Sequence, residues 1–312
     1  MPMNPLQVRN LTKKFTSTST AVDHISFELK RGETLGILGA NGAGKTTTIS
    51  MLLGLLTPTA GAITYFGKDF FKHRSEIMQQ VGSGTAYAQL PTQLTIFRNL
   101  DIFGRLYGIE RKARHARIQE LLEKLGMWHF RNRKTSGLSA GEMTRIILAK
   151  AFLHTPSVVL LDEPTASLDI DIAQTIRRFI KEQQGFGKSF IITSHNMHEM
   201  TEVCDRILVM QDGKIIAAST PYMLAKSTHQ TTLSLMVGNN IDKCVAFAQE
   251  KGLKHTIIRS TIEIEIDEQN VAAILTELAS RSIAYSDIEI RKPSLEDYFL
   301  ELQRKRRKKP TS

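Results

Sequence analysis

The feature that most constrains this chain is a glycine-rich loop between an apolar run and a helical pattern. The loop, Gly39–Thr46, reads GANGAGKT and fits the pattern G-x-x-x-x-G-K-[ST]. Residues 34–38 before it predict a strand, and apolar residues at helical spacing after it predict a helix. Glycines at these positions let backbone N–H groups surround phosphate oxygens without a clashing Cβ. The context therefore predicts nucleotide binding. A dinucleotide-binding loop fits less well, because Lys-Thr-Thr follows the last glycine.

The loop supplies most of the candidate ligand-binding residues. These are Gly39, Asn41, Gly42, Ala43, Gly44, Lys45, Thr46 and Thr47. Lys45 offers a positive charge to the outer phosphates, and the hydroxyl of Thr46 can bind Mg²⁺. The amino end of the following helix adds a partial positive charge.

A second motif ends an apolar run. Residues 158–161 read VVLL, which is typical of a strand buried on both faces, and Asp162 and Glu163 follow. Asp162 can hold Mg²⁺ through water, and Glu163 can polarise an attacking water. Alone, an apolar run that ends in two acids is often only a strand end. Together with the phosphate loop it indicates triphosphate hydrolysis.

A third motif completes a family resemblance. The segment Leu138–Glu142, LSAGE, is similar to the LSGGQ signature, and over about residues 6–220 the chain resembles the ATP-binding subunits of ABC transporters. The resemblance implies that Ser139, Gly141 and Glu142 contact the γ-phosphate of ATP held by a second subunit. Without the resemblance, Ser139 would be read only as a helix cap.

The resemblance also assigns residues outside these motifs. Phe15 matches the aromatic residue that stacks on adenine, and Asp169 lies in a segment that matches the D-loop. His195 matches the switch histidine that touches the γ-phosphate, so Glu163 and His195 are the implied catalytic residues. A competing reading pairs His195 with His198, one helical turn away, as metal ligands, but no third ligand is evident.

Two positions depart from the family pattern. Ala40 stands where proline is usual, which changes little because backbone amides bind the phosphates. Ala86 stands where the family places a glutamine that contacts Mg²⁺ and water. Gln89 is three residues away, so either Gln89 replaces that ligand through a loop shift or the contact is lost.

The order of patterns predicts an α/β chain with two domains. The resemblance implies that residues 1–220 form an ABC cassette of the P-loop NTPase class, with a RecA-like core, an antiparallel β subdomain and an inserted helical subdomain over about 95–155. Polar residues near 218–230 mark a boundary, and residues 221–303 predict a small α+β domain with strands near 232–237, 256–258, 261–266 and 288–290. Residues 304–312 predict a basic, disordered tail.

Composition limits the remaining possibilities. Hydrophobic residues are 41% and charged residues 23%, which is typical of globular proteins. No run approaches the ~18 apolar residues of a membrane span, and we expect neither a cleaved signal peptide nor a disulfide between Cys204 and Cys244. The net charge is +10, but six positive charges lie in 304–309, which leaves only +4 elsewhere. Such a tail can bind anionic lipid or nucleic acid, or simply remain solvated.

Further segments narrow the class. Residues 94–100 and 103–108 look like the region of exporter ATPases that receives a membrane partner, and residues 293–302 are similar to the C-terminal helix of ABC-2 type exporter ATPases. The resemblance implies a homodimer or heterodimer that hydrolyses ATP with Mg²⁺ and drives export through integral membrane permease subunits. It would lie peripherally on the cytoplasmic face of the inner (plasma) membrane.

Two alternatives stay open at this point. One is a soluble ABC ATPase that acts on ribosomes or nucleic acid, although the chain has one cassette and no long coiled-coil insertion. The other is a non-hydrolysing regulatory module, which Ala86 would favour and Glu163 argues against.

Overall fold

A computed structural model describes residues 3–16, 18–85, 90–166, 168–228 and 231–307. The chain forms two compact units, Met1–Thr220 and Pro221–Ser312. Among the described residues, no helix is long and apolar enough to cross a bilayer.

The larger sheet of the first unit has six described strands in the order β10-β9-β3-β8-β7-β6. All are parallel except β10, which pairs antiparallel with β9. The strands are β3 (Thr34–Leu38), β6 (Val81–Gly84), β7 (Val158–Asp162), β8 (Ser189–Ser194), β9 (Arg206–Gln211) and β10 (Lys214–Ser219). Every residue of β3, β7 and β8 is buried, as expected for apolar strands covered on both faces.

The smaller sheet of this unit is antiparallel. Its four described strands follow the order β2-β1-β4-β5. They are β1 (Leu6–Lys14), β2 (Thr20–Leu29), β4 (Ala60–Tyr65) and β5 (Lys68–Asp69). Apolar side chains of β1, β2 and β4 join those of β3 and of helix α1 (Lys45–Leu52) in one buried cluster. This cluster fixes α1, and the glycine loop before it, between the two sheets.

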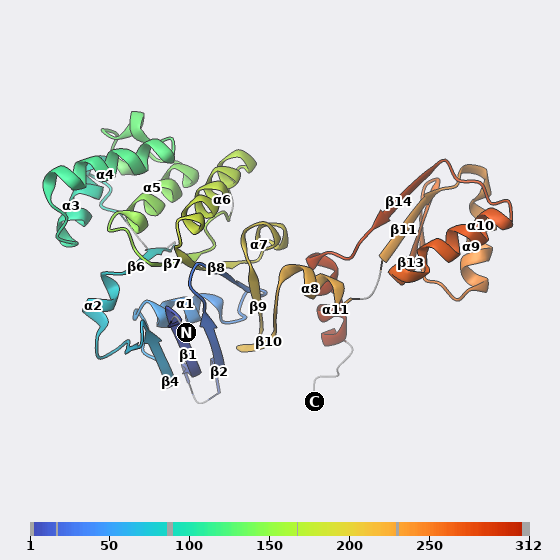
Figure 1. Cartoon of the computed structure of the whole chain (residues 1–312), viewed down its shortest axis with the longest axis horizontal. Helices are drawn as coiled ribbons and strands as arrows, with labels where there is room; N and C mark the ends of the chain where they lie inside the picture. Colours follow the sequence, from blue (N-terminus) through green and yellow to red (C-terminus); the bar gives the residue numbers. More distant parts are fainter. Residues whose placement is uncertain (1–2, 17, 86–89, 167, 229–230, 308–312) are drawn as a thin grey trace. The chain divides into compact units, whose positions relative to one another are not determined.

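Helices fill the rest of the first unit. They are α2 (Arg74–Met78), α3 (Ile96–Leu106), α4 (Arg111–Lys124), α5 (Ala140–Phe152), α6 (Ile170–Gly185) and α7 (Met197–Val203), with 3-10 turns at Trp128–Phe130 and Thr135–Gly137. In the view of Figure 1, α3 to α6 lie above β6, β7 and β8, and β1, β2 and β4 lie below. The described residues between 95 and 155 form helices and 3-10 turns and contain no β-strand. The inserted segment is thus helical and has its own buried cluster against β7 and β8.

The second unit contains a four-stranded antiparallel sheet among its described residues. Its elements are α8 (Pro221–Lys226), β11 (Thr231–Met236), α9 (Ile241–Glu250), β12 (His255–Ile258), β13 (Thr261–Ile266), α10 (Val271–Ser280), β14 (Asp287–Arg291) and α11 (Leu295–Arg307), with 3-10 turns at Gly238–Asn240 and Glu268–Asn270. From β11 to β14 the chain runs β-α-β-β-α-β with strand order β12-β13-β11-β14. That topology is ferredoxin-like. Strand β13, TIEIEI, alternates half-buried and buried residues, so one face of the sheet packs against the core.

One sequence expectation for this unit is wrong. The sequence predicts that a disordered tail begins at residue 304, but helix α11 continues through Arg307. Arginine and lysine have high helix propensity, so a run of them can extend an existing helix despite its charge. The remaining tail residues, 308–312, lie outside the described part. Cys204 and Cys244 are both buried free thiols, as expected.

Candidate functional site

Several of the predicted site residues follow strands that end at one edge of the larger sheet. Strands β7, β3 and β8 are parallel, and β8 lies between the other two. The register places Leu38 beside Ser194 and Asp162 beside Thr193. The chain therefore leaves all three strands at the same carboxyl edge, which is where open α/β sheets bind ligands.

The glycine loop wraps around the lysine at its end. Gly44 has a φ of 102°, and a Cβ there would clash with the carbonyl oxygen of Ala21, so only glycine fits. The ammonium group of Lys45 donates hydrogen bonds to the carbonyl oxygens of Gly39, at 2.8 Å, and Ala40, at 3.4 Å. Lys45 is only 6% exposed. Its charge is thus held over the loop, at the amino end of α1.

Glu163 stands between a cation and an imidazole. One carboxylate oxygen is 3.6 Å from the ammonium nitrogen of Lys45, and the other contacts Nδ1 of His195. Glu163 has a φ of 51°, a conformation that non-glycine residues seldom adopt. Its N–H holds this conformation by donating to the hydroxyl and carbonyl oxygens of Thr193, at 3.0 and 3.1 Å. The structure therefore brings together Lys45, Glu163 and His195.

Thr193 is a site residue that none of the sequence motifs singles out. It is fully buried, and its hydroxyl donates to Oδ1 of Asp162 while accepting from the N–H of Glu163. One hydroxyl thus fixes both acids that follow β7. The β7–β8 register carries the signal for this role, because it pairs Asp162 with Thr193.

The loop that carries His195 is braced by a buried acid. The hydroxyl of Ser194 donates to Glu199 at 2.7 Å and accepts from the N–H of Asn196 at 3.0 Å. Glu199 is buried, and Asn196 caps α7 by accepting from its N–H. His198, considered above as a metal ligand, has a side chain that is 75% exposed beside Glu202. The described residues contain no group of three or more His, Cys, Asp or Glu arranged to hold a metal.

The LSAGE residues form the start of α5. Ser139 is the exposed N-cap, and its hydroxyl accepts from the N–H of Glu142 at 3.2 Å. The carboxylate of Glu142 accepts from the N–H of Ser139 at 2.8 Å, which completes a capping box. Gly141 is buried. Among the described residues, no hydrogen bond or ion pair joins these three residues to Lys45 or Glu163.

The other candidates have different surroundings. Phe15 is 58% exposed, and the ammonium group of Lys13 lies 5.5 Å from its ring centre. Asp169 is exposed at the start of α6 and makes no capping hydrogen bond. Thr46 and Thr47 are half-buried in the first turn of α1. Gln89, the candidate metal ligand, and Ala86 lie outside the described residues.

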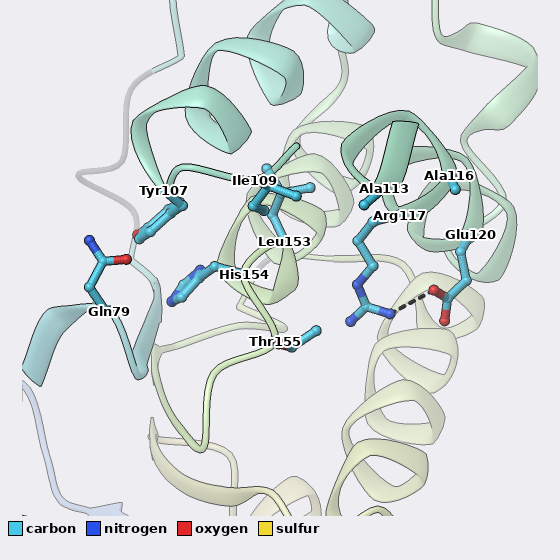
Figure 2. A pocket seen from close by; sticks show the side chains of 10 residues that line it. All are labelled: Gln79, Tyr107, Ile109, Ala113, Ala116, Arg117, Glu120, Leu153, His154 and Thr155. Atoms are coloured by element: carbon cyan, nitrogen blue, oxygen red, sulfur yellow. Dashed lines mark hydrogen bonds and ion pairs between the residues drawn. The ribbon is translucent and has the colours of Figure 1, made fainter. Parts of the chain in front are cut away.

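A hollow of about 460 Å³ lies away from this edge, between α4 and the ends of α2, α3 and α5. Figure 2 shows Tyr107 and His154 side by side at its wall. Their rings stack with centres 3.8 Å apart and planes 7° apart. Burial lowers the pKa of His154 to about 4, so the ring is neutral at physiological pH. Ile102 and Leu106 of α3, which shortly precede Tyr107 in the chain, are exposed, and Leu106 is 71% exposed.

Comparisons with known proteins agree on one class. A family model described as "ABC transporter" matches residues 22–166. The Nod factor export ATP-binding protein I of Burkholderia lata is 37% identical over 73% of this chain and 74% of that relative. The linearmycin resistance ATP-binding protein LnrL of Bacillus subtilis is 32% identical over 95% of this chain and 97% of that relative. A solved ATP-binding subunit of an ABC transporter matches with a TM-score of 0.66, at 24% identity, over 72% of this chain and 92% of that structure. The structural likeness confirms the predicted fold class.

Proposed function

The chain belongs to the ATP-binding subunits of ABC transporters, which hydrolyse ATP, and we propose that it works as a dimer to drive export through separate permease subunits of the ABC-2 type. The proposal rests mainly on the observation that the two expected parts of the ATP site do not meet within one chain. Lys45, Glu163 and His195 meet at the sheet edge, whereas the exposed amino end of α5 contacts none of them within the described chain.

ATP binding would begin at the glycine loop. The backbone N–H groups of the loop and the amino end of α1 attract phosphate. Lys45 would release Glu163 and bind the outer phosphates instead, because phosphate carries more negative charge than one carboxylate. Phe15, whose ring is exposed, would receive the adenine.

The donor set beside the loop fits Mg²⁺. Mg²⁺ prefers hard oxygen ligands, and the hydroxyl of Thr46 and the carboxylate of Asp162 are of that kind. The hydroxyl of Thr193 holds one oxygen of Asp162, which leaves the second oxygen for the ion or for one of its waters. When bound, Mg²⁺ would neutralise phosphate charge. Gln89 would be a further ligand if its loop brings it there.

Glu163 and His195 would then carry out different tasks. Released from Lys45, the Glu163 carboxylate would accept a proton from the attacking water. His195 already touches Glu163 and would donate a hydrogen bond to the γ-phosphate. The double anchorage of the Glu163 N–H on Thr193 would keep the carboxylate in place through this exchange.

A second copy, or a related subunit, would complete the site. Ser139 presents its hydroxyl and the start of α5 to solvent, and helix amino ends bind anions well. Placed over the γ-phosphate of ATP bound to the other subunit, this end supplies donors that a single chain lacks. ATP would therefore hold two subunits together, and hydrolysis would separate them.

The permease would dock on the helical segment. Residues 94–108, which resemble the partner-binding region of exporter ATPases, include the exposed Ile102 and Leu106 of α3. The hollow in Figure 2 opens beside the end of this helix and is lined by Tyr107, Ile109 and Leu153. An apolar side chain from the partner fits such a surface. This contact would place the chain on the cytoplasmic face of the inner (plasma) membrane.

Fractionation of native membranes tests the proposal. After a high-salt wash, the chain should remain in the membrane fraction and co-purify in detergent with an integral membrane protein. Release by salt together with nucleic acid or ribosomes would contradict the exporter assignment. Leu106→Asp should release the chain, and Phe186→Asp, which changes another exposed apolar side chain, should not.

A further inference from the structure

Arg133, in the segment before α5, forms an ion pair with Glu142 in the first turn of that helix. The guanidinium of Arg133 donates through Nη1 to Oε1 of Glu142, at 3.1 Å, and through Nη2 to the carbonyl oxygen of Gly137. Its backbone is also fixed, because the N–H of Arg133 donates to Phe130 at 2.8 Å and its carbonyl accepts from Ile96 at 3.0 Å. Arg133 therefore links the start of α3, the turn Thr135–Gly137 and the start of α5.

Glu142 places a negative charge at the amino end of α5, where the γ-phosphate is proposed to bind. Its carboxylate belongs to the capping box of Ser139, so a negative charge lies at the helix end that would receive a phosphate. Like charges repel, so this carboxylate would weaken phosphate binding unless a nearby cation offsets its charge. Glu142 cannot simply turn away, since both of its oxygens already accept hydrogen bonds.

We propose that Arg133 is a positioning residue of the shared site, which neutralises Glu142 and holds the turn before Ser139 so that α5 can accept the γ-phosphate. The inference rests on the proposed dimer. Arg133 would make two separable contributions: its charge compensates that of Glu142, and its guanidinium donates a hydrogen bond to the carbonyl oxygen of Gly137. Only the first contribution depends on the residue at position 142.

A comparison with Arg145 separates this role from a general loss of charge. Arg145 lies on α5 one turn further on, and its guanidinium donates to the carbonyl oxygens of Gly141, at 3.3 Å, and Leu125, at 3.2 Å. It thus braces the same helix without pairing with a carboxylate there. Arg145→Gln is the matched control for Arg133→Gln, since both remove one positive charge and bonds to backbone carbonyls.

The experiment is a double-mutant cycle in a Glu163→Gln parent, in which we expect hydrolysis to be slow because the proton-accepting carboxylate is removed. The ATP concentration for half-maximal dimerisation is measured by light scattering for the parent and for Arg133→Gln, Glu142→Gln and the double variant. Arg133→Gln should raise this concentration about tenfold when Glu142 is intact, but less than about twofold when Glu142→Gln is already present. Arg133→Lys should recover part of the loss, and the effect of Arg145→Gln should not depend on the residue at position 142.

Two further readouts keep the outcomes distinct. ATP binding to the monomer should be the same in all variants, and thermal unfolding checks that each one folds. An equal effect of Arg133→Gln in both backgrounds, or no effect, would overturn the inference and leave the dimer standing. A parent that does not dimerise with ATP would overturn the proposed function and the inference with it.

Discussion

The ion pair between Lys45 and Glu163 should oppose ATP binding, because phosphate must replace the carboxylate beside the ammonium group. The two charges lie 3.6 Å apart, which corresponds to about 1.2 kcal/mol in water and about 4.6 kcal/mol at an effective dielectric constant of 20. The side chains of Lys45 and Glu163 are only 6% and 24% exposed, so the cost of holding both charges away from water offsets much of the attraction, and we take a net value of about 1 kcal/mol. Glu163→Gln should therefore bind ATP about fivefold more tightly, or about 1 kcal/mol.

Calorimetric titration of ATP without Mg²⁺ measures this effect, because neither hydrolysis nor closure of the dimer then contributes. The matched control is Glu182→Gln, which removes the same charge from a surface pair with Lys124 at 2.6 Å. The control should bind ATP like the unaltered protein. Higher salt should shrink the gain in Glu163→Gln. Equal or weaker binding by Glu163→Gln would refute the competition between carboxylate and phosphate.

Two other regions give independent predictions. Burial lowers the pKa of His154 from 6.5 to about 4, so the unfolded chain binds more protons than the folded chain between these values, and stability should fall as pH drops from 6.5 to 4. His154→Gln should flatten this fall in the midpoint of thermal unfolding, and an unchanged slope would show that His154 does not contribute to it. Replacing the cations of residues 304–309 by glutamine should leave ATP hydrolysis intact but weaken binding to anionic liposomes at low salt, since each cation contributes about 1 kcal/mol near such a surface. Equal liposome binding by both forms would identify the tail as merely solvated.

The parts of the site that follow from local sequence were predictable. Gly44, whose φ of 102° and closeness to the carbonyl oxygen of Ala21 require glycine, belongs to the G-x-x-x-x-G-K-[ST] pattern, which can be recognised in the sequence. Buried apolar runs likewise predict β3, β7 and β8. Residues that end parallel strands must share an edge, so the meeting of Lys45, Glu163 and His195 could be expected.

The parts that depend on register and tertiary contact were not predictable. The role of Thr193 needs the β7–β8 pairing, and the role of Arg133 needs a turn that brings it back to Glu142. The ferredoxin-like order of the second unit needs pairing between strands far apart in the chain. The extension of α11 to Arg307 does not follow from the run of like charges, because such a run taken alone favours disorder. Only the helix that precedes the run explains the extension.

A site shared between two subunits makes ATP hydrolysis depend on protein concentration, and this dependence can be measured. Hydrolysis per subunit with ATP and Mg²⁺ would be measured over a range of protein concentrations, with light scattering on the same samples. If Ser139 of one copy completes the site of Lys45 and Glu163 in another, activity per subunit should rise with concentration in step with the dimer. Full activity per subunit in a preparation that light scattering shows to be monomeric with ATP present would show that one chain hydrolyses ATP without a second, and would rule out the shared site.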